Sequence, residues 1–158
     1  ATLAAAAAGA QVTHVDASKG MVTWAKENAV SSGLKDAPIR WLVDDCVKFV
    51  EREIRRGNTY DAIIMDPPSY GRGPKGEIWK IEDMIHPLIK LCTKILSKDA
   101  LFFLVNSYTT GLAPAVLTYM IATELKSWNG HVESQEIGLP VTESGLVLPC
   151  GASGRWER

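Results

Sequence analysis

The sequence predicts a doubly wound α/β fold with a mostly parallel sheet and a C-terminal antiparallel hairpin. Short apolar runs rich in β-branched residues alternate with longer segments of helical periodicity. Three successive runs end in an acidic residue, at Asp16, Asp45 and Asp66. The last part of the chain holds two adjacent extended runs with a short connection, which is typical of an antiparallel strand pair.

Composition restricts the class of protein. The 158 residues are 46% hydrophobic and 22% charged, which suits one domain over residues 1–158. A net charge of -1 argues against general affinity for nucleic acid or anionic membranes, although a local basic patch remains open. The cysteines Cys46, Cys92 and Cys150 lack metal-ligand spacing, and their odd number indicates a reducing compartment. We therefore expect a cytoplasmic protein with no metal site and no membrane span.

The first half of the chain should begin with a helix over residues 1–8, because alanine is the best helix former. Gly9 can end that helix, and Ser18 can cap the next one. In that next helix Met21 and Trp24 fall at helical spacing. The further elements expected in this half are a strand over 11–15, a helix over 19–30, a strand over 39–43, a helix ending at 55–57 and a buried strand over 60–65.

The second half should begin with a polar, Gly-rich loop over residues 71–80. Periodic apolar residues then predict a helix over 82–96, and a buried run predicts a strand over 100–105. Pro114 opens a helix that extends to Leu125. The hairpin strands are expected over 131–139 and 146–150.

The stretch from Asp66 to Tyr70 combines an acid, two prolines and an aromatic residue. Proline cannot donate to a sheet ladder, so the preceding strand must stop at Asp66. The acid therefore lies at the carboxyl end of a buried strand, which is where open α/β sheets bind ligands. The alternative is a strand-ending turn with an exposed acid and a packing tyrosine.

The acids at the strand ends form a second pattern. The carboxyl ends of parallel strands share one edge of a sheet, so Asp16, Asp45 and Asp66 are expected to line one cleft. The first can accept hydrogen bonds from ribose hydroxyls, and the next from the exocyclic amine of a base. In the alternative, Asp16, Asp44 and Asp45 cap helices, which acids do well at a positive helix terminus.

These motifs resemble those of a known enzyme family. The segments Val15-Asp16-Ala17-Ser18, Val43-Asp44-Asp45-Cys46 and Asp66-Pro67-Pro68-Ser69-Tyr70 are similar to the second, third and fourth motifs of class I S-adenosylmethionine-dependent methyltransferases. More narrowly, residues 65–76 and the helix after them resemble the ribosomal RNA large-subunit methyltransferase group. The terminal hairpin over 131–156 also matches, and the resemblance covers essentially the whole chain.

The resemblance implies roles for individual residues. It implies that Asp16, with Ala17 beside it, holds the ribose of S-adenosyl-L-methionine. Asp45 would accept from the adenine amine, and the backbone amide of Cys46 would face the adenine ring. Asp66 would also contact the cofactor. The methylated group would be held by Asp66 and the Pro67 carbonyl, and Tyr70 would stack on a base turned out of its helix. The further substrate-binding residues are Pro68, Ser69, Arg72 and Lys75.

The acceptor atom is expected to be a base nitrogen. A carbon-5 cytosine methyltransferase needs a cysteine nucleophile, and in those relatives it follows the fifth strand of the family's sheet. Residues 105–109 at that place contain no cysteine. The implied substrate is therefore RNA, ribosomal by resemblance, methylated on nitrogen rather than carbon.

The loop over residues 71–80 carries Arg72, Lys75 and Lys80, with Trp79 close by in sequence. Basic and aromatic residues together suit nucleic acid, so the loop is expected to contact phosphate or cover the substrate. The alternative is a solvated loop without such a role.

The family's first strand and its Gly-rich loop are not found in the sequence. That strand would lie between the strands that end at Asp16 and Asp66, and unpaired buried backbone is costly. We therefore expect the sequence to be part of a longer protein whose missing N-terminal segment is a structural partner. The alternatives are a nicotinamide-dependent Rossmann oxidoreductase, because Asp16 would serve its ribose equally well, and a non-catalytic binding module.

Overall fold

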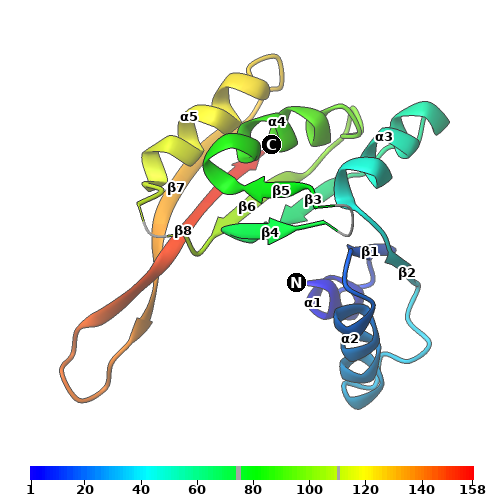
Figure 1. Ribbon diagram of the computed structural model, residues 1–158, viewed down its shortest axis with the longest axis horizontal. Helices are drawn as coiled ribbons and strands as arrows, with labels where there is room; N and C mark the ends of the chain where they lie inside the picture. Colours follow the sequence, from blue (N-terminus) through cyan, green and yellow to red (C-terminus); the bar gives the residue numbers. More distant parts are fainter. Residues whose placement is uncertain (74–75, 110) are drawn as a thin grey trace. The chain divides into compact units, whose positions relative to one another are not determined.

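The computed structural model describes residues 1–73, 76–109 and 111–158 (Figure 1). The chain divides into two compact units, Ala1–Arg56 and Gly57–Arg158. Within the described residues, the first unit contains a two-stranded sheet, and the second contains a four-stranded and a two-stranded sheet; each unit has its own helices. The single domain expected over residues 1–158 stays a prediction.

The first unit is built around a pair of parallel strands. Strands β1 and β2 pair from Val12 opposite Ile39 to Asp16 opposite Val43, so both carboxyl ends lie at the same edge. Helices precede, connect and follow the two strands. The elements are α1 (Thr2–Ala7), β1 (Val12–Asp16), α2 (Lys19–Ser31), β2 (Ile39–Val43) and α3 (Cys46–Arg56).

Helix α2 begins as predicted, because the Ser18 hydroxyl accepts from the backbone N–H of Met21 at 3.3 Å. Its buried residues are Val22 and Ala29. Met21 and Trp24 are 47% and 59% exposed, so they lie on the outer side of the helix in this unit.

The second unit contains a four-stranded sheet in the order β3-β6-β8-β7. Strands β3 and β6 are parallel, whereas β8 is antiparallel to both β6 and β7. The predicted α/β fold with a C-terminal antiparallel hairpin is therefore confirmed (Figure 1). The elements are β3 (Ala62–Met65), β4 (Tyr70–Arg72), β5 (Ile78–Lys80), α4 (Ile81–Thr93), β6 (Phe102–Ser107), α5 (Pro114–Glu124), β7 (His131–Pro140) and β8 (Val147–Glu157).

The core of the second unit lies between this sheet and its helices. Phe103 and Val105 of β6 are fully buried, and Trp156 of β8 is 1% exposed. Helix α5 comes very close to β8, since a Cβ at Gly154 would lie 2.8 Å from Ile121 Cδ1 and 2.9 Å from Leu117 Cβ. A glycine there permits the helix to pack directly on the strand.

Two elements differ from expectation. The segment predicted as a polar loop over 71–80 contains an antiparallel strand pair, β4 and β5, with Gly71 opposite Trp79. The last strand continues to Glu157 rather than ending at Cys150. Both strand extensions follow from pairing with a neighbour rather than from local β-propensity.

Strands β1 and β3 each have one strand partner among the described residues, β2 and β6 respectively. The upstream strand expected between them stays a prediction. Among residues 1–73, 76–109 and 111–158, we find no helix with both the length and the apolar content that a membrane crossing requires.

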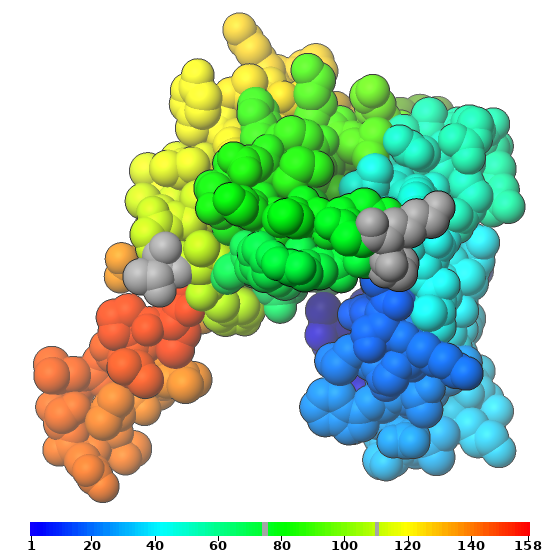
Figure 2. Space-filling model, in the orientation of Figure 1, coloured from blue at the N-terminus to red at the C-terminus, as the bar shows by residue number. Residues whose placement is uncertain are grey.

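The connection between β7 and β8 forms a long hairpin end in the second unit. In Figure 2 this orange segment projects away from the helices of the unit. Its apolar side chains are well exposed, with Leu146 at 70% and Leu139 and Val147 both at 61%. The hairpin therefore presents apolar surface beyond the part of the sheet covered by α5.

Candidate functional site

Asp16 ends β1 and turns the chain toward α2. Its Oδ1 accepts a hydrogen bond from the backbone N–H of Ser18 at 2.6 Å, while Ala17 between them is exposed. The carboxylate therefore fixes the strand-to-helix turn through one oxygen. Its second oxygen is the atom that it can offer to a ligand hydroxyl.

The end of β2 lies directly beside Asp16. The backbone N–H of Asp44 donates to the Asp16 carbonyl at 3.0 Å, which continues the parallel ladder past Val43. The Asp44 carboxylate pairs with the Arg52 guanidinium and accepts from the backbone N–H of Asp45. The hydrogen bond from Arg52 lowers the pKa of Asp44, so this acid serves as an internal ion-pair partner.

Asp45 caps α3. Its Oδ1 accepts from the backbone N–H of Lys48 at 2.9 Å, and its carbonyl accepts from Phe49 at 2.9 Å. The capping alternative raised by the sequence is thus correct for this residue. Asp45 is nevertheless exposed, so the cap leaves the side chain accessible to a ligand.

Cys46 is the first residue of α3, and its thiol points toward the Val15 carbonyl with a separation of 4.0 Å between Sγ and O. Desolvation raises the pKa of this thiol, and the negative charges of Asp45 and Asp16 raise it further. The thiol therefore remains protonated and is a poor nucleophile. These contacts show that Asp16, Asp45 and Cys46 lie together at one sheet edge.

Asp66 follows β3 in the second unit. Met65 is opposite Val105, so Asp66 leaves the sheet at the carboxyl end of β3, next to the end of β6. Asp66 is exposed, but partial desolvation raises the pKa of its carboxyl group. Because Asp66 belongs to the second unit, the single cleft expected for all three acids stays a prediction.

The turn after Asp66 is held by side-chain hydrogen bonds. The Trp79 indole N–H donates to the Pro68 carbonyl at 2.6 Å, and the hydroxyls of Ser69 and Thr109 are 2.6 Å apart. The sequence places Trp79 in a loop expected to contact nucleic acid and does not identify Thr109 as part of the site. The position of Thr109 shortly after a buried strand was the available signal.

Tyr70 lies at the start of β4 and is 51% exposed. The Arg72 Nε donates to the Tyr70 hydroxyl at 2.9 Å, which holds the phenol beside a positive charge. Pro67 is half-buried, whereas Pro68 and Arg72 are exposed. The predicted substrate-binding residue Lys75 lies outside the described residues.

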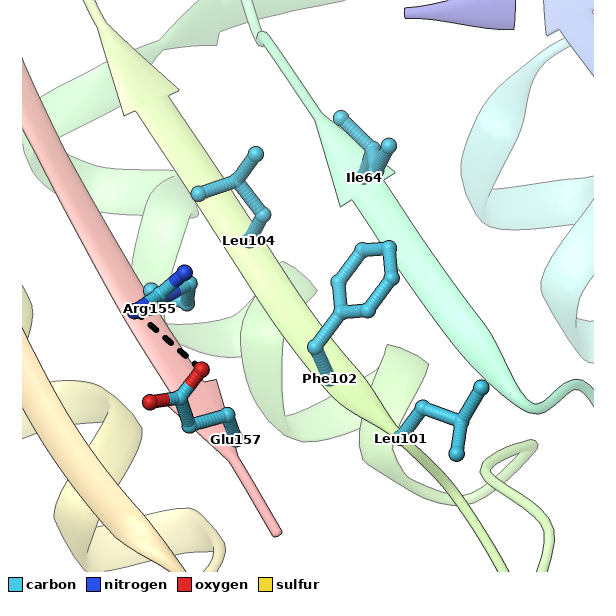
Figure 3. A pocket seen from close by; sticks show the side chains of 6 residues that line it. All are labelled: Ile64, Leu101, Phe102, Leu104, Arg155 and Glu157. Carbon is cyan, nitrogen blue, oxygen red and sulfur yellow. Dashed lines mark ion pairs between the residues drawn. The ribbon is translucent and has the colours of Figure 1, made fainter. Parts of the chain in front are cut away.

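A pocket of about 290 Å³ lies on the open face of the sheet in the second unit (Figure 3). Phe102 and Leu104 line it, and in β6 they alternate with the buried Phe103 and Val105. None of the predicted site residues lines this pocket, whose walls are Ile64, Leu101, Phe102, Leu104, Arg155 and Glu157. The acceptor-side residues are therefore gathered at the strand ends rather than in this hollow.

No metal cluster accompanies these residues. Within the part of the chain that the structure describes, no group of three or more histidine, cysteine or acidic side chains is arranged to hold a metal ion. The polar groups that the strand ends do present are carboxylates, backbone carbonyls and hydroxyls. Such groups suit the hydroxyls and amines of a nucleoside.

No family model matches the chain. Among solved structures, it is similar to the SAM-dependent methyltransferase from Agrobacterium tumefaciens, with a TM-score of 0.90 and 42% identity. That match covers 98% of this chain and 51% of the other. The fold is also that of SMU.776, assigned as a methyltransferase and complexed with SAH, with a TM-score of 0.76 and 22% identity over 98% of this chain and 41% of the other.

A curated relative points in the same direction. The ribosomal RNA large subunit methyltransferase K/L of Pseudoalteromonas atlantica is 35% identical over 86 residues, which are 54% of this chain. The chain spans 12% of that relative's length and about half of the Agrobacterium chain. By fold and by sequence, the chain is similar to class I S-adenosylmethionine-dependent methyltransferases and, more narrowly, resembles the ribosomal RNA large-subunit methyltransferase group.

Proposed function

We propose that this chain is part of an enzyme that transfers a methyl group from S-adenosylmethionine to a base nitrogen of ribosomal RNA. The observation that carries the proposal is the fixed turn after β3, which begins with Asp66 and Pro67. Hydrogen bonds with Trp79 and Thr109 hold the two residues that follow, Pro68 and Ser69. The similar Agrobacterium structure is named a SAM-dependent methyltransferase and the curated relative a ribosomal RNA methyltransferase, which supports this cofactor and reaction type over a nicotinamide-dependent oxidoreductase.

The edge formed by β1 and β2 is the proposed cofactor side. The free oxygen of Asp16 would accept from the ribose hydroxyls, beside the exposed Ala17. Asp45 would accept from the adenine amine, and the backbone N–H of Cys46 at the start of α3 would face the ring. The residues present fit a nucleoside because two exposed or half-buried carboxylates and a helix start lie together.

The strand end after β3 is the proposed acceptor side. Asp66 and the Pro67 carbonyl both accept hydrogen bonds and would orient a base amine. Tyr70, with half of its surface open, would stack on a base turned out of its helix. Pro68, Ser69 and Arg72 would contact the same nucleotide from the turn and from β4.

The reaction depends more on correct positioning of the acceptor amine than on general acid–base catalysis. S-adenosylmethionine supplies a methyl group that is already activated by its sulfonium. A base amine is a poor nucleophile because its lone pair is delocalised, so fixed acceptors at Asp66 and Pro67 direct its hydrogens and leave the lone pair facing the methyl donor. A misplacement of about 1 Å can cost on the order of 100-fold in rate, which explains the value of a rigid turn.

Cys92 and Cys46 are poorly suited to act as nucleophiles, which favours nitrogen methylation, whereas Cys150 has to be tested. Cys92 is buried in α4, and the thiol of Cys46 has a raised pKa beside three acids. Cys150 lies in β8 next to Gly151, where an added Cβ would collide with the Ser107 carbonyl oxygen, so this part of β8 passes close to the end of β6. Cys150 is therefore the thiol on which a carbon-methylation mechanism would depend, and its substitution discriminates the two reactions.

The test uses the full-length natural protein that contains this chain and ribosomal RNA from cells lacking it. Labelled methyl transfer is followed by digestion to nucleosides and mass spectrometry of the product. The expected product is a nitrogen-methylated base, formed by the unsubstituted protein and by Cys150→Ser but not by Asp66→Ala. Asp99→Ala, an exposed acid of the same unit, is the matched control and should retain activity.

Two results would overturn the proposal. A carbon-methylated product that disappears in Cys150→Ser would show the other mechanism. Full activity of Asp66→Ala would show that the turn does not hold the acceptor.

A further inference from the structure

Trp79 makes a contact that the expected role of its loop in nucleic-acid binding does not explain. The residue lies in β5 and is half-buried, and its indole Nε1–H donates to the Pro68 carbonyl at 2.6 Å. Pro68 is the second proline of the turn that begins at Asp66. Since Pro67 and Pro68 have no N–H groups, the turn can be anchored only through its carbonyls and the residues around it.

The other anchors of the turn are on Ser69. Its carbonyl accepts from the backbone N–H of Ile81 at 3.1 Å, at the start of α4. Its hydroxyl bonds to Thr109, whose own N–H donates to the hydroxyl of the fully buried Ser107 at 3.2 Å. Ser69 is thus tied to α4 on one side and to the end of β6 on the other.

Trp79 is the anchor closest to the proposed acceptor groups. One peptide unit separates the Pro68 carbonyl that it holds from the Pro67 carbonyl, which precedes it in the chain. Gly71 lies opposite Trp79 in the β4–β5 pair, and a Cβ added there would lie 3.6 Å from Trp79 Cβ and 3.9 Å from Pro68 Cγ. The start of the Trp79 side chain and the Pro68 ring are therefore both near the backbone of β4.

We propose that Trp79 is a positioning residue that fixes the Asp66-Pro67-Pro68 turn through its hydrogen bond to the Pro68 carbonyl. The inference rests on the proposed methyltransferase function and adds a residue that acts through the turn rather than on the substrate. Loss of the indole N–H lets the Pro67 carbonyl and the Asp66 carboxylate move relative to the acceptor nitrogen. The S-adenosylmethionine contacts proposed for Asp16, Ala17, Asp45 and Cys46 lie at the ends of β1 and β2 and at the start of α3, and they are left unchanged.

The variants separate the hydrogen bond from the ring. Trp79→Phe keeps an aromatic ring and removes the N–H, whereas Trp79→His keeps a ring N–H at the corresponding position, because histidine Nε2 is as many bonds from Cβ as indole Nε1. Trp24→Phe is the matched control, since Trp24 is 59% exposed on α2. All three are made in the full-length natural protein.

Two measurements are made on each variant. The first is methyl transfer to ribosomal RNA, with kcat and the KM for S-adenosylmethionine determined separately. The second is amide hydrogen exchange at residues 69–73, which directly follow the two prolines and report on the anchoring of the turn without requiring activity. Trp79→Phe is expected to lose about tenfold or more in kcat at unchanged KM, with faster exchange at those residues. Trp79→His is expected to recover part of the kcat and part of the protection from exchange. Trp24→Phe is expected to change neither kcat nor exchange.

The failures are distinguishable. Unchanged kcat and unchanged exchange in Trp79→Phe would overturn the inference. A lower melting temperature and faster exchange with unchanged kcat would make Trp79 structural only, which also overturns it. If the unsubstituted protein transfers no methyl group while exchange still rises in Trp79→Phe, the anchor exists and the proposed function is wrong.

Discussion

The carboxylate of Asp45 accepts a hydrogen bond from the backbone N–H of Lys48 at 2.9 Å, in the first turn of α3. The same exposed side chain is the proposed acceptor for the adenine amine. A capping role and a binding role are therefore combined in one residue, and variants must be chosen to separate them.

Asp45→Ala should lose both roles. Loss of the cap is expected to cost about 1 kcal/mol of stability. Loss of the adenine contact should also weaken S-adenosylhomocysteine binding, measured by calorimetric titration. Asp45→Ser keeps a capping hydroxyl but is too short to reach a ligand, so it should restore the melting temperature and not the affinity. Normal affinity in Asp45→Ser would contradict the binding role.

Asp16 is expected to affect cofactor affinity more than turnover. A hydrogen bond to a charged group contributes about 1.5–3 kcal/mol, so Asp16→Ala should weaken S-adenosylhomocysteine binding by roughly 10- to 100-fold. Asp16→Asn keeps an oxygen that can accept from the Ser18 N–H and should preserve the turn into α2. If Asp16→Ala lowers only the melting temperature and binds normally, Asp16 has only its structural role.

Asp66 should set an acid limb in the pH profile of methyl transfer. Partial desolvation raises the pKa of Asp66, and only its ionised carboxylate is purely an acceptor. Activity should therefore fall as pH decreases, at a midpoint above the usual aspartate value of about 3.9. Asp66→Asn should be slower and lack this limb. An unchanged limb in Asp66→Asn would assign the titration to another group.

The same raised pKa has a consequence for stability. A carboxyl with a raised pKa in the folded state binds its proton more tightly there than in the unfolded chain, so it favours folding at low pH and this contribution is lost as pH rises through the folded-state pKa. The melting temperature of Asp66→Asn should therefore gain on the unsubstituted protein as pH increases from about 4 to about 7. Thermal melts at several pH values measure the difference, and a melting temperature of Asp66→Asn that falls relative to the unsubstituted protein over this range would contradict the assignment.

Gly151→Ala should strongly destabilise the second unit. A Cβ at this position would collide with the carbonyl oxygen of Ser107 and lie 3.0 Å from the Cα of Tyr108, both of which are backbone atoms. Overpacking of this kind costs about 1–3 kcal/mol, measured by denaturant unfolding. Gly20→Ala is the control, because in helix α2 its Cβ meets only the Ser18 hydroxyl at 3.7 Å, so stability should rise by roughly 0.5–1 kcal/mol. Equal stability of both variants would show that β8 can move away from β6.

The sequence predicted the elements whose signals are local. The strand over Ile39–Val43 is observed at its predicted bounds, and the helix predicted over 82–96 is observed as α4 in spite of Pro87 inside it. The helix is stabilised by its apolar face, on which Ile81, Ile85 and Ile89 are buried. The strand ends at Asp16 and Met65 follow from the acid and the prolines that come next.

The parts that were missed depend on contacts between distant residues. Gly151 and Gly154 are poor strand formers, which made the last strand look short at Cys150. They are required there because β8 passes close to Ser107 and to Leu117 and Ile121 of α5. Strands β4 and β5 have only three residues each, and Gly71 has low β-propensity. The sequence therefore did not predict this strand pair, which brings Trp79 within hydrogen-bonding distance of the Pro68 carbonyl.

The candidate site shows the same division. The acids at the strand ends could be named from sequence, and so could the choice between capping and binding for Asp45. The sequence did not predict which role each acid has. The ion pair of Asp44 with Arg52, for example, depends on the packing of α3. Thr109 was not identified, since its bond to Ser69 joins two loops that are far apart in the chain.

The position of β8 between β6 and β7 has a consequence for synthesis of the protein. The edge of β6 opposite β3 is paired only when β8, which is made after α5 and β7, is in place. Until then the growing chain on the ribosome carries β6 with an open edge. The second unit must therefore close late and through contacts of long sequence separation, which are slow to form. Nascent chains stopped before Val147 should be the species that bind chaperones and aggregate.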